Sequence, residues 1–364
     1  MARERLLQAE KIRRIVVRGT NWVGDAVMTV PALRALRGLL PQAHITLATR
    51  PRTEGLFAGA DFIDDLLLYE RPARDLRAVY RQMREWRHRR FDLALLFQNA
   101  FEAAVIAAGA RVPLRLGYAT DNRRALLTHP LPLPGWRSER HEVFYYLNIV
   151  AELERLLGGA TNVLRQEPAY ALNVSPQRQA QARKLLHAKG AQGSRRLVAL
   201  CPGSTNSRAK RWPAAAYAAL ADKFIEEAGA DVLLVGAADE LAVSLEVKAL
   251  MRGRPLMLTG ETNLSEAVAV LSLADALVTN DTGPAHIAAA LERPTLVIFG
   301  PTDPRTTRPF ASAAEIIRRP PDCAPCMLRD CPIDHRCMTS ITPEEVFKRA
   351  CALMERAAVA EARA

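Results

Sequence analysis

The chain has 364 residues, which suits two domains of about 150 to 200 residues better than one core. No apolar run reaches the roughly 18 residues of a membrane span, and the charged start "MARERLLQAEKIRR" excludes a secretory signal, so we expect a cytosolic protein. The formal net charge is +11 and rests mainly on arginine, which favours oxyanions; nucleic acid, an anionic membrane surface and an acidic substrate all stay open as partners.

Strands and helices are predicted to alternate along the first part of the chain. Strands are expected at 13–18, 44–49, 65–69 and 91–97, with helices after residue 25 and through 74–90. This alternation is typical of a parallel sheet with crossover helices.

A second alternation begins after a polar, proline-bearing linker at 161–179. Its strand-bearing segments are 195–204, 231–240, 255–260, 275–283 and 294–304. The sequence therefore predicts an α/β protein with two Rossmann-like domains, at 1–170 and 171–342. An amphipathic helix is expected at 343–364, and we expect it to pack back on the first domain.

The loop after the first predicted strand resembles a phosphate-binding loop but lacks its cations. Gly19 and Gly24 are followed by Asp25, where a P-loop would carry lysine and a hydroxyl residue. A carboxylate there would repel phosphate. Asp25 is thus either a functional acid or the N-cap of a helix at 26–37.

Polar residues also follow the strands of the second predicted domain, at the edge where ligands of open α/β sheets bind. They are Ser204, Thr205, Asn206, Lys210, Glu240, Asp281, Thr282, Gly283 and His286. Backbone amides at helix starts, together with a lysine, favour an anion such as a diphosphate. The alternatives are an N-cap for Asp281, a core histidine for His286 and a solvated basic face for Lys210.

Four cysteines are concentrated between 323 and 337. Cys323, Cys326, Cys331 and Cys337 surround His335, which is enough to ligate zinc or an iron–sulfur cluster. The spacing matches no standard zinc knuckle, so a structural metal, free thiols and a disulfide all stay open.

The segment 71–91 is expected to form a helix with an apolar face and many arginines elsewhere. Such a helix suits an anionic membrane surface or a phosphorylated sugar chain, although most charge runs are merely solvated. Nucleic acid is not expected, because no recognised motif or aromatic stacking pattern accompanies the arginines.

Several motifs together resemble the ADP-heptose:lipopolysaccharide heptosyltransferases, especially the heptosyltransferase II branch. They are "NWVGDAVMTVPALRAL", "CPGSTNSRAKRWP", "VTNDTGPAHIAAALERPTLVIFGPTDP" and "ITPEEV". The resemblance implies a GT-B fold, in which two Rossmann-like domains face each other across a cleft, the C-terminal one holding the nucleotide-sugar. It also implies inverting heptose transfer to the lipopolysaccharide inner core with no cofactor required, so that any ion at the cysteines would be structural.

The resemblance also implies roles for single residues. Asp25 would be the general base that activates the acceptor hydroxyl, and Lys210 would stabilise the departing diphosphate. Ser204, Thr205, Asn206, Thr282 and Gly283 would lie at the phosphates, Asp281 at the heptose, His286 nearby and Glu240 on the ribose or adenine side. Arg50, Arg52, Arg123 and Arg124 are the expected acceptor contacts.

The resemblance places the protein at the inner face of the cytoplasmic membrane, with ADP-heptose and an inner-core acceptor as partners. Two other interpretations stay open: an enzyme with a different donor or acceptor, such as heptosyltransferase I or a nucleotide-sugar epimerase, and a non-catalytic nucleotide-sugar binding protein. Retention of both Asp25 and Lys210 argues against a pure binder. The sequence leaves the acceptor sugar and the oligomeric state open.

Overall fold

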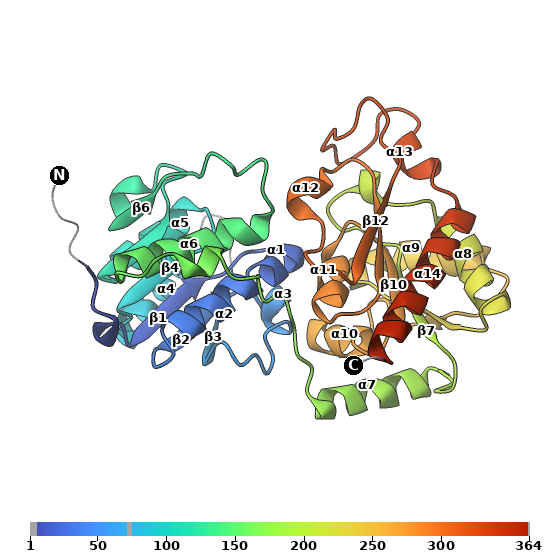
Figure 1. The fold of residues 1–364 in the computed structure, drawn as a ribbon, viewed down its shortest axis with the longest axis horizontal. Coiled ribbons are helices and arrows are strands. Elements are labelled where there is room, and N and C mark those ends of the chain that lie inside the picture. Colours follow the sequence, from blue (N-terminus) through green and yellow to red (C-terminus); the bar gives the residue numbers. More distant parts are fainter. Residues whose placement is uncertain (1–5, 71–74, 363–364) are drawn as a thin grey trace. The chain divides into compact units, whose positions relative to one another are not determined.

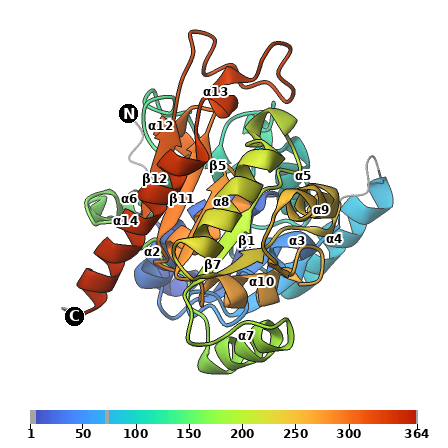
Figure 2. The same cartoon turned by 90° about the vertical axis from the view of Figure 1, so that its right-hand side faces the viewer.

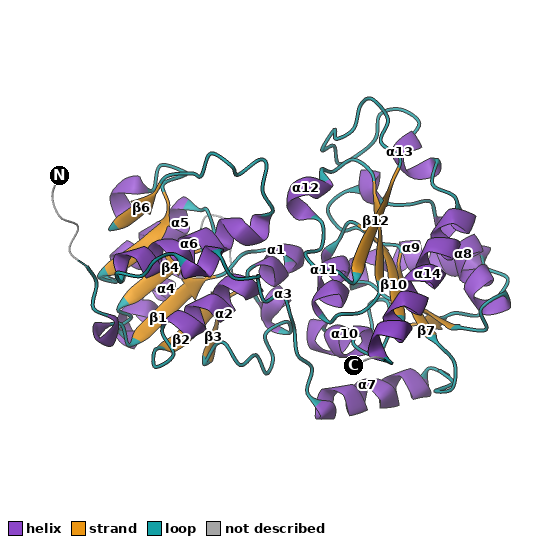
Figure 3. Cartoon of the chain, in the orientation of Figure 1, coloured by secondary structure: helices purple, strands orange, loops and turns teal. Residues whose placement is uncertain are grey.

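The computed structural model describes residues 6–70 and 75–362, and the chain divides into two compact units, Met1–Tyr170 and Ala171–Ala364. Each unit holds one six-stranded parallel sheet with helices between the strands (Figure 1, Figure 3). The predicted α/β class with two Rossmann-like domains is confirmed. No helix in these described ranges is long and apolar enough to cross a membrane.

The first unit alternates strands and helices in the order that a parallel sheet requires. Its strands are β1 (Arg14–Arg18), β2 (His44–Thr49), β3 (Asp65–Leu68), β4 (Leu93–Leu96), β5 (Leu114–Tyr118) and β6 (His129–Leu131). Its helices are α1 (Val23–Met28), α2 (Val30–Leu39), α3 (Pro51–Glu54), α4 (Leu76–Arg89), α5 (Phe101–Gly109) and α6 (Glu142–Leu156). The expected helix at 71–91 is thus α4, and its first residues, 71–74, lie outside the described ranges.

The second unit repeats this plan. Its strands are β7 (Leu197–Cys201), β8 (Asp231–Leu234), β9 (Leu256–Met257), β10 (Ala276–Asn280), β11 (Thr295–Phe299) and β12 (Ala314–Arg318). Its helices are α7 (Pro176–Ala188), α8 (Ala214–Glu226), α9 (Leu241–Leu250), α10 (Leu264–Leu271), α11 (Gly283–Ala290), α12 (Pro304–Thr307), α13 (Arg336–Thr339) and α14 (Pro343–Glu361). Two short 3-10 turns, η4 (Arg208–Lys210) and η5 (Ala238–Glu240), follow β7 and β8.

The central strands form because their sequences are continuous apolar runs that are covered on both faces. Every residue of β4, β7, β10 and β11 is buried. Strands of parallel sheets that helices cover on both faces have such continuous apolar sequences, whereas strands with one solvated face alternate apolar and polar residues. In the first unit α2 packs against α6, and α4 packs against α5.

The C-terminal helix packs on the second unit. Val346, Ala350 and Met354 of α14 belong to the core of the second unit, together with Trp212 and Phe224. The helix contacts α8, β10 and β11, and Figure 2 shows it beside α8. The apolar face of α14 is therefore part of the core of the second unit.

Candidate active site

In both sheets, successive strands are added first toward one edge and then toward the other, and the switch comes at the same place in the strand order. The orders are β3-β2-β1-β4-β5-β6 and β12-β11-β10-β7-β8-β9, so each sheet follows the Rossmann order when its strands are counted from its own start. The connection that follows β1 leads toward one edge of the first sheet, and the connection that follows β4 leads toward the other edge. The connections that follow β7 and β10 diverge in the same way in the second sheet. Ligands of such sheets bind outside the carboxyl ends of these neighbouring strands, which gives each unit one expected site.

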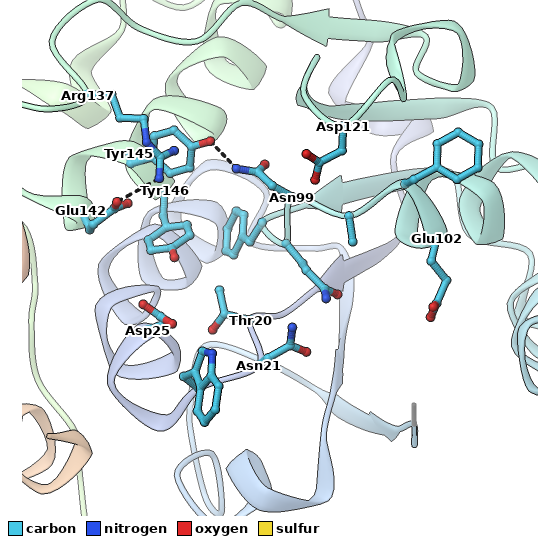
Figure 4. Close-up of a pocket in the computed structure, with 15 residues that line it drawn as sticks. Thr20, Asn21, Asp25, Asn99, Glu102, Asp121, Arg137, Glu142, Tyr145 and Tyr146 are labelled. Atoms are coloured by element: carbon cyan, nitrogen blue, oxygen red, sulfur yellow. Dashed lines mark hydrogen bonds and ion pairs between the residues drawn. The ribbon is translucent and has the colours of Figure 1, made fainter. Parts of the chain in front are cut away.

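The first unit has a pocket of about 730 Å³ at this position (Figure 4). Residues that follow β1, β4 and β5, residues of α6 and one residue of the loop before α6 line it. They are Thr20, Asn21, Trp22, Asp25, Phe97, Gln98, Asn99, Ala100, Phe101, Glu102, Asp121, Arg137, Glu142, Tyr145 and Tyr146.

Asp25 lines this pocket from the first turn of α1. The helix begins at Val23 with Trp22 as the N-cap residue, so the alternative of an N-cap for a helix at 26–37 is wrong. A carboxylate in a first helical turn is stabilised in its ionised form by the free amides and the helix dipole. Figure 4 shows Asp25 on the same side of the pocket as Thr20 and Tyr146.

Two neighbouring polar atoms of the β1–α1 loop are available to a ligand. The Thr20 hydroxyl oxygen and the Asn21 amide oxygen are buried and have no hydrogen-bond partner within the described ranges. Buried polar atoms without partners are costly unless a ligand or water satisfies them. They therefore favour a ligand that carries hydroxyl groups.

Another part of the lining comes from α6 and the loop before it, and no sequence motif singled it out. The Arg137 guanidinium lies 3.1 Å from the Glu142 carboxylate and 4.1 Å above the Tyr145 ring centroid. Burial raises the pKa of Glu142, against the opposing effect of Arg137. Burial, reinforced by the Asp25 and Glu142 charges, holds the pKa of Tyr146 well above its usual value. The Tyr146 phenol therefore stays protonated and is a hydrogen-bond donor.

Arg123 does not fit the role of an acceptor contact. Its side chain is fully buried, and its guanidinium donates to the carbonyls of Tyr118 and Gln98 and to the Asn99 side chain. The Asn99 amide in turn donates to the Tyr145 hydroxyl at 2.6 Å. Because its donors are used inside the protein, Arg123 holds the β4 loop in position, and we correct its assignment to a positioning residue.

The other three predicted acceptor arginines lie outside the lining of this pocket. Arg52 is exposed, and its guanidinium lies 5.4 Å from the ring centroid of Trp22, which does line the pocket. Arg50 is half-buried at the start of α3, and Arg124 is exposed. Of these three, Arg52 has a described contact with a residue that lines the pocket.

In the second unit, Lys210 and Asp281 form an ion pair at the ends of β7 and β10. The Lys210 ammonium donates to the Asp281 carboxylate at 2.7 Å and to its carbonyl at 3.2 Å. The Thr302 hydroxyl donates to the same carboxylate oxygen at 2.7 Å. Lys210 is therefore more than a solvated basic residue. Asp281 is not an N-cap either, because Thr282 caps α11, which begins at Gly283.

Asn280 ties these two loops together, and the sequence analysis missed it. Its side-chain amide donates to the carbonyls of Pro202 and Gly203, and its oxygen accepts from the Trp212 backbone and the Tyr217 hydroxyl. All four side-chain interactions of this buried amide are satisfied. The β7 loop is consequently fixed against the end of β10.

Glu240 lies beside the same loop, buried against two glycines. A Cβ at Gly203 would lie 2.3 Å from the Glu240 carboxyl carbon, and one at Gly236 would lie 2.9 Å from a carboxyl oxygen. The carboxylate accepts a hydrogen bond from the Ala237 amide, while burial raises its pKa. Only glycine permits this close approach at Gly203.

The remaining predicted donor residues differ in exposure. Ser204 and His286 are buried, whereas Thr205 and Asn206 are exposed. The Thr205 hydroxyl faces the Glu240 carboxylate at 3.5 Å. Thr282 and Gly283 are half-buried at the start of α11. All of these residues therefore come to the carboxyl edge of the second sheet or to the helix that starts there.

The cysteine cluster does not form a metal-ligand group. Burial, together with a smaller effect of neighbouring thiols, raises the pKa of Cys337, whose sulfur would lie 3.2 Å from a Cβ at the buried Gly300. Cys323 is exposed, and all six cysteines are free thiols. Within the described ranges, no three His, Cys, Asp or Glu side chains lie together as metal ligands. The described residues therefore give no support for a structural metal, which is one of the three alternatives that the sequence left open.

Comparison with known proteins gives one consistent family. Residues 79–336 match the model of glycosyltransferase family 9 (heptosyltransferase). The chain is 30% identical to lipopolysaccharide heptosyltransferase 2 of Salmonella typhimurium, over 84% of this chain and 88% of that enzyme. It is 31% identical to lipooligosaccharide heptosyltransferase 2 of Haemophilus influenzae over the same shares. The solved structure of Escherichia coli ADP-heptose lps heptosyltransferase II superposes with a TM-score of 0.81 and 27% identity, over 94% of this chain and 99% of that one.

Proposed function

The chain belongs to glycosyltransferase family 9 (heptosyltransferase), and from this we propose that it moves L-glycero-D-manno-heptose from ADP-heptose to a heptose of the lipopolysaccharide inner core, with inversion. The observation that carries the proposal is the position of Asp25 in the pocket at the carboxyl end of β1. A heptose is rich in hydroxyl groups, and the unpartnered Thr20 and Asn21 oxygens match such a ligand.

The first unit supplies the acceptor site in this proposal. The Asp25 carboxylate takes the proton of the acceptor hydroxyl while the hydroxyl oxygen attacks the anomeric carbon of the donor. The protonated Tyr146 phenol is available to donate to a sugar oxygen beside it. The Arg137–Glu142 pair lines the same pocket, and we propose that its guanidinium meets acidic groups of the core oligosaccharide.

The second unit supplies the donor site. As the bond between the anomeric carbon and the diphosphate oxygen breaks, negative charge develops on ADP. Lys210 stabilises that charge: an ammonium has three donors, and Asp281 occupies two of them. The amides at the start of α11 add a positive partial charge on the same edge. We propose that these groups act without a cofactor.

The acceptor in this proposal is carried by a lipid, so we place the enzyme at the inner face of the cytoplasmic membrane, as a peripheral protein. The test is transfer of heptose from ADP-heptose to two truncated lipopolysaccharides, one ending in the Kdo sugar and one in the first heptose, with a chelator present. We expect product only with the heptose-terminated acceptor. Product only with the Kdo-terminated acceptor would indicate heptosyltransferase I, and loss of transfer on chelation would contradict the cofactor-free mechanism.

A further inference from the structure

One face of α4 collects cations and exposed apolar side chains that the proposed reaction does not use. Leu76 and Tyr80 are 82% and 64% exposed, an unusual state for such large side chains. Arg77, Arg81, Arg84, Arg87 and His88 are exposed on the same helix. Successive helical residues turn by 100°, so these seven residues fall on one side, opposite the buried Ala78 and Trp86.

The C-terminal half of this face opens into a second hollow, of about 610 Å³. Its lining consists of Arg14, Arg84, Arg87, His88 and Arg90, with no carboxylate among them. The described part of the chain offers none of the four arginines an ion-pair partner. The nearby acids are used elsewhere, since Glu85 and Asp65 pair with Arg89, and Asp92 accepts from the Arg13 and Arg14 amides.

The hollow rests on a rigid base. Trp86 is 1% exposed and meets Phe91 edge to face at 5.9 Å, directly beneath the last turn of α4. The Arg14 guanidinium donates to the Arg89 carbonyl, which fixes the start of β1 to the same turn. The arginines therefore project from a backbone that is already ordered, and a bound anion need not organise it.

A helix dipole accounts for only part of this cluster. Cations in the last turn of a helix are favourable, which suits Arg87 and His88. Arg14 lies on a strand, however, and Leu76 and Tyr80 lie at the other end of the helix. Several unpaired arginines at one place repel each other, and that repulsion is relieved by a phosphate-bearing partner, which guanidinium groups bind in a forked geometry.

We propose that α4 is a membrane dock, in which the five-residue hollow binds the phosphate of anionic phospholipids while Leu76 and Tyr80 enter the headgroup boundary. A free phosphate or a nucleic acid would use the arginines but leave the apolar pair in water. An amphipathic helix with arginines and an aromatic residue on one side fits an anionic bilayer surface instead.

The position of α4 in the sheet agrees with this partner. The helix connects the carboxyl end of β3 to the amino end of β4, so its N-terminal end lies toward the sheet edge that carries Asp25. Gln82 on its inner side accepts from Arg18, which also binds the pocket residue Gln98. A bilayer along α4 would therefore lie beside the acceptor pocket of the same unit. This step rests on the proposed function; the dock itself does not.

The test is co-sedimentation of the full chain with vesicles of phosphatidylcholine alone or mixed with phosphatidylglycerol. Wild type should bind the mixed vesicles and release them as salt rises. The combined variant Arg84→Gln, Arg87→Gln, Arg90→Gln should lower the partition coefficient at least about tenfold, because each arginine near an anionic surface contributes to binding. The matched control Arg165→Gln, Arg183→Gln, Arg254→Gln removes the same charge from exposed, unpaired sites and should bind like wild type.

A second variant separates a membrane from a soluble anion. Leu76→Ser with Tyr80→Ser keeps every arginine and should also weaken vesicle binding. If Leu76→Ser with Tyr80→Ser binds vesicles like wild type while the arginine variant does not, the hollow is a phosphate site only, and the membrane dock is overturned. Equal loss in the arginine variant and its control would overturn the site itself. Transfer to an acceptor stripped of its acyl chains should not change in any of these variants, so a failed dock is distinguishable from a failed enzyme.

Discussion

The two units share one strand order but differ in the charged groups at the same place. The pocket at β1 and β4 is lined by four carboxylates, Asp25, Glu102, Asp121 and Glu142, and by one arginine, Arg137. The edge at β7 and β10 instead presents the Lys210 ammonium paired with Asp281, the buried Glu240 carboxyl, helix-start amides and glycines. The fold therefore determines where a ligand binds, and the loop residues determine whether the site handles a proton or a diphosphate.

The loops also differ in how many of their buried hydrogen-bonding groups have a partner. In the second unit Asn280 uses all its hydrogen-bonding groups to hold the β7 loop, and Asp281 is occupied by Lys210 and Thr302. In the first unit Thr20 and Asn21 keep unpartnered oxygens within the described ranges. In the proposed function, this contrast corresponds to a preformed donor edge and to an acceptor pocket whose hydrogen bonds are completed by substrate.

The largest expected effect that tests this contrast comes from Lys210→Met. The substitution keeps the length of the side chain and removes the charge that balances the departing diphosphate. We expect kcat to fall about 10²- to 10³-fold, the usual cost of losing one such donor. Arg208→Met in the same 3-10 turn is the control, because its exposed guanidinium pairs with Asp330 away from Asp281. A kcat equal to wild type in both variants would break the assignment of the second unit.

Arg123→Met tests whether that arginine positions the pocket or contacts substrate. Removal of the buried guanidinium leaves the Gln98 and Tyr118 carbonyls without their donor, so the free energy of unfolding should fall by about 2 to 3 kcal/mol in denaturant titrations. Arg124→Met, next in the chain and exposed, should stay within about 0.5 kcal/mol of wild type. Loss of activity with unchanged stability in Arg123→Met would restore its role as an acceptor contact.

Gly203→Ala probes the close approach of the β7 loop to Glu240. The added Cβ overlaps the carboxyl group, so we expect a loss of about 1 to 3 kcal/mol in unfolding free energy and weaker ADP binding by calorimetry. Gly193→Ala is the matched control, since a Cβ there meets nothing within 4 Å. If the two variants bind ADP equally well, Glu240 does not shape the donor site.

The smallest effect is a pH dependence at Glu240. Because burial raises the pKa of its carboxyl in the folded state, the unfolded chain loses this proton first as pH rises. The Glu240 contribution to stability is thus present below its ordinary pKa and is lost as pH rises through the folded pKa. Glu240→Gln lacks that loss, so its melting temperature relative to wild type should increase from acidic to neutral pH. A constant difference in melting temperature between the variant and wild type across this pH range would contradict burial of Glu240 as the cause.

The sequence predicted the strands that are buried on both faces, because such strands have continuous apolar sequences. β7, β10 and β11 have such runs, and the site loops follow them directly. It missed β5 and β12, where "LRLGY" and "AEIIR" carry charged residues in half-buried strands, and it missed β6, which contains a proline. These strands are held by pairing with a neighbour, which no local pattern reports.

The residues of the candidate site likewise fall into those that the sequence predicted and those that it missed. Asp25 and Lys210 belong to motifs that follow predicted strands, so the sequence alone singled them out. Glu142 and Tyr146 reach the pocket from a helix far along the chain, and only tertiary packing brings them to Asp25. Arg123 was assigned to the acceptor because a loop arginine suggests a contact, whereas its burial was not readable from sequence.

The most direct test of the division between the units is single-turnover heptose transfer by Asp25→Asn, combined with calorimetric binding of ADP-heptose to the same protein. The amide keeps the shape of the side chain but cannot accept the acceptor proton. We predict a transfer rate lowered about 10²- to 10⁴-fold with donor affinity unchanged. A wild-type rate in this variant, or loss of donor binding along with the rate, would contradict the assignment of proton removal to the first unit and donor binding to the second.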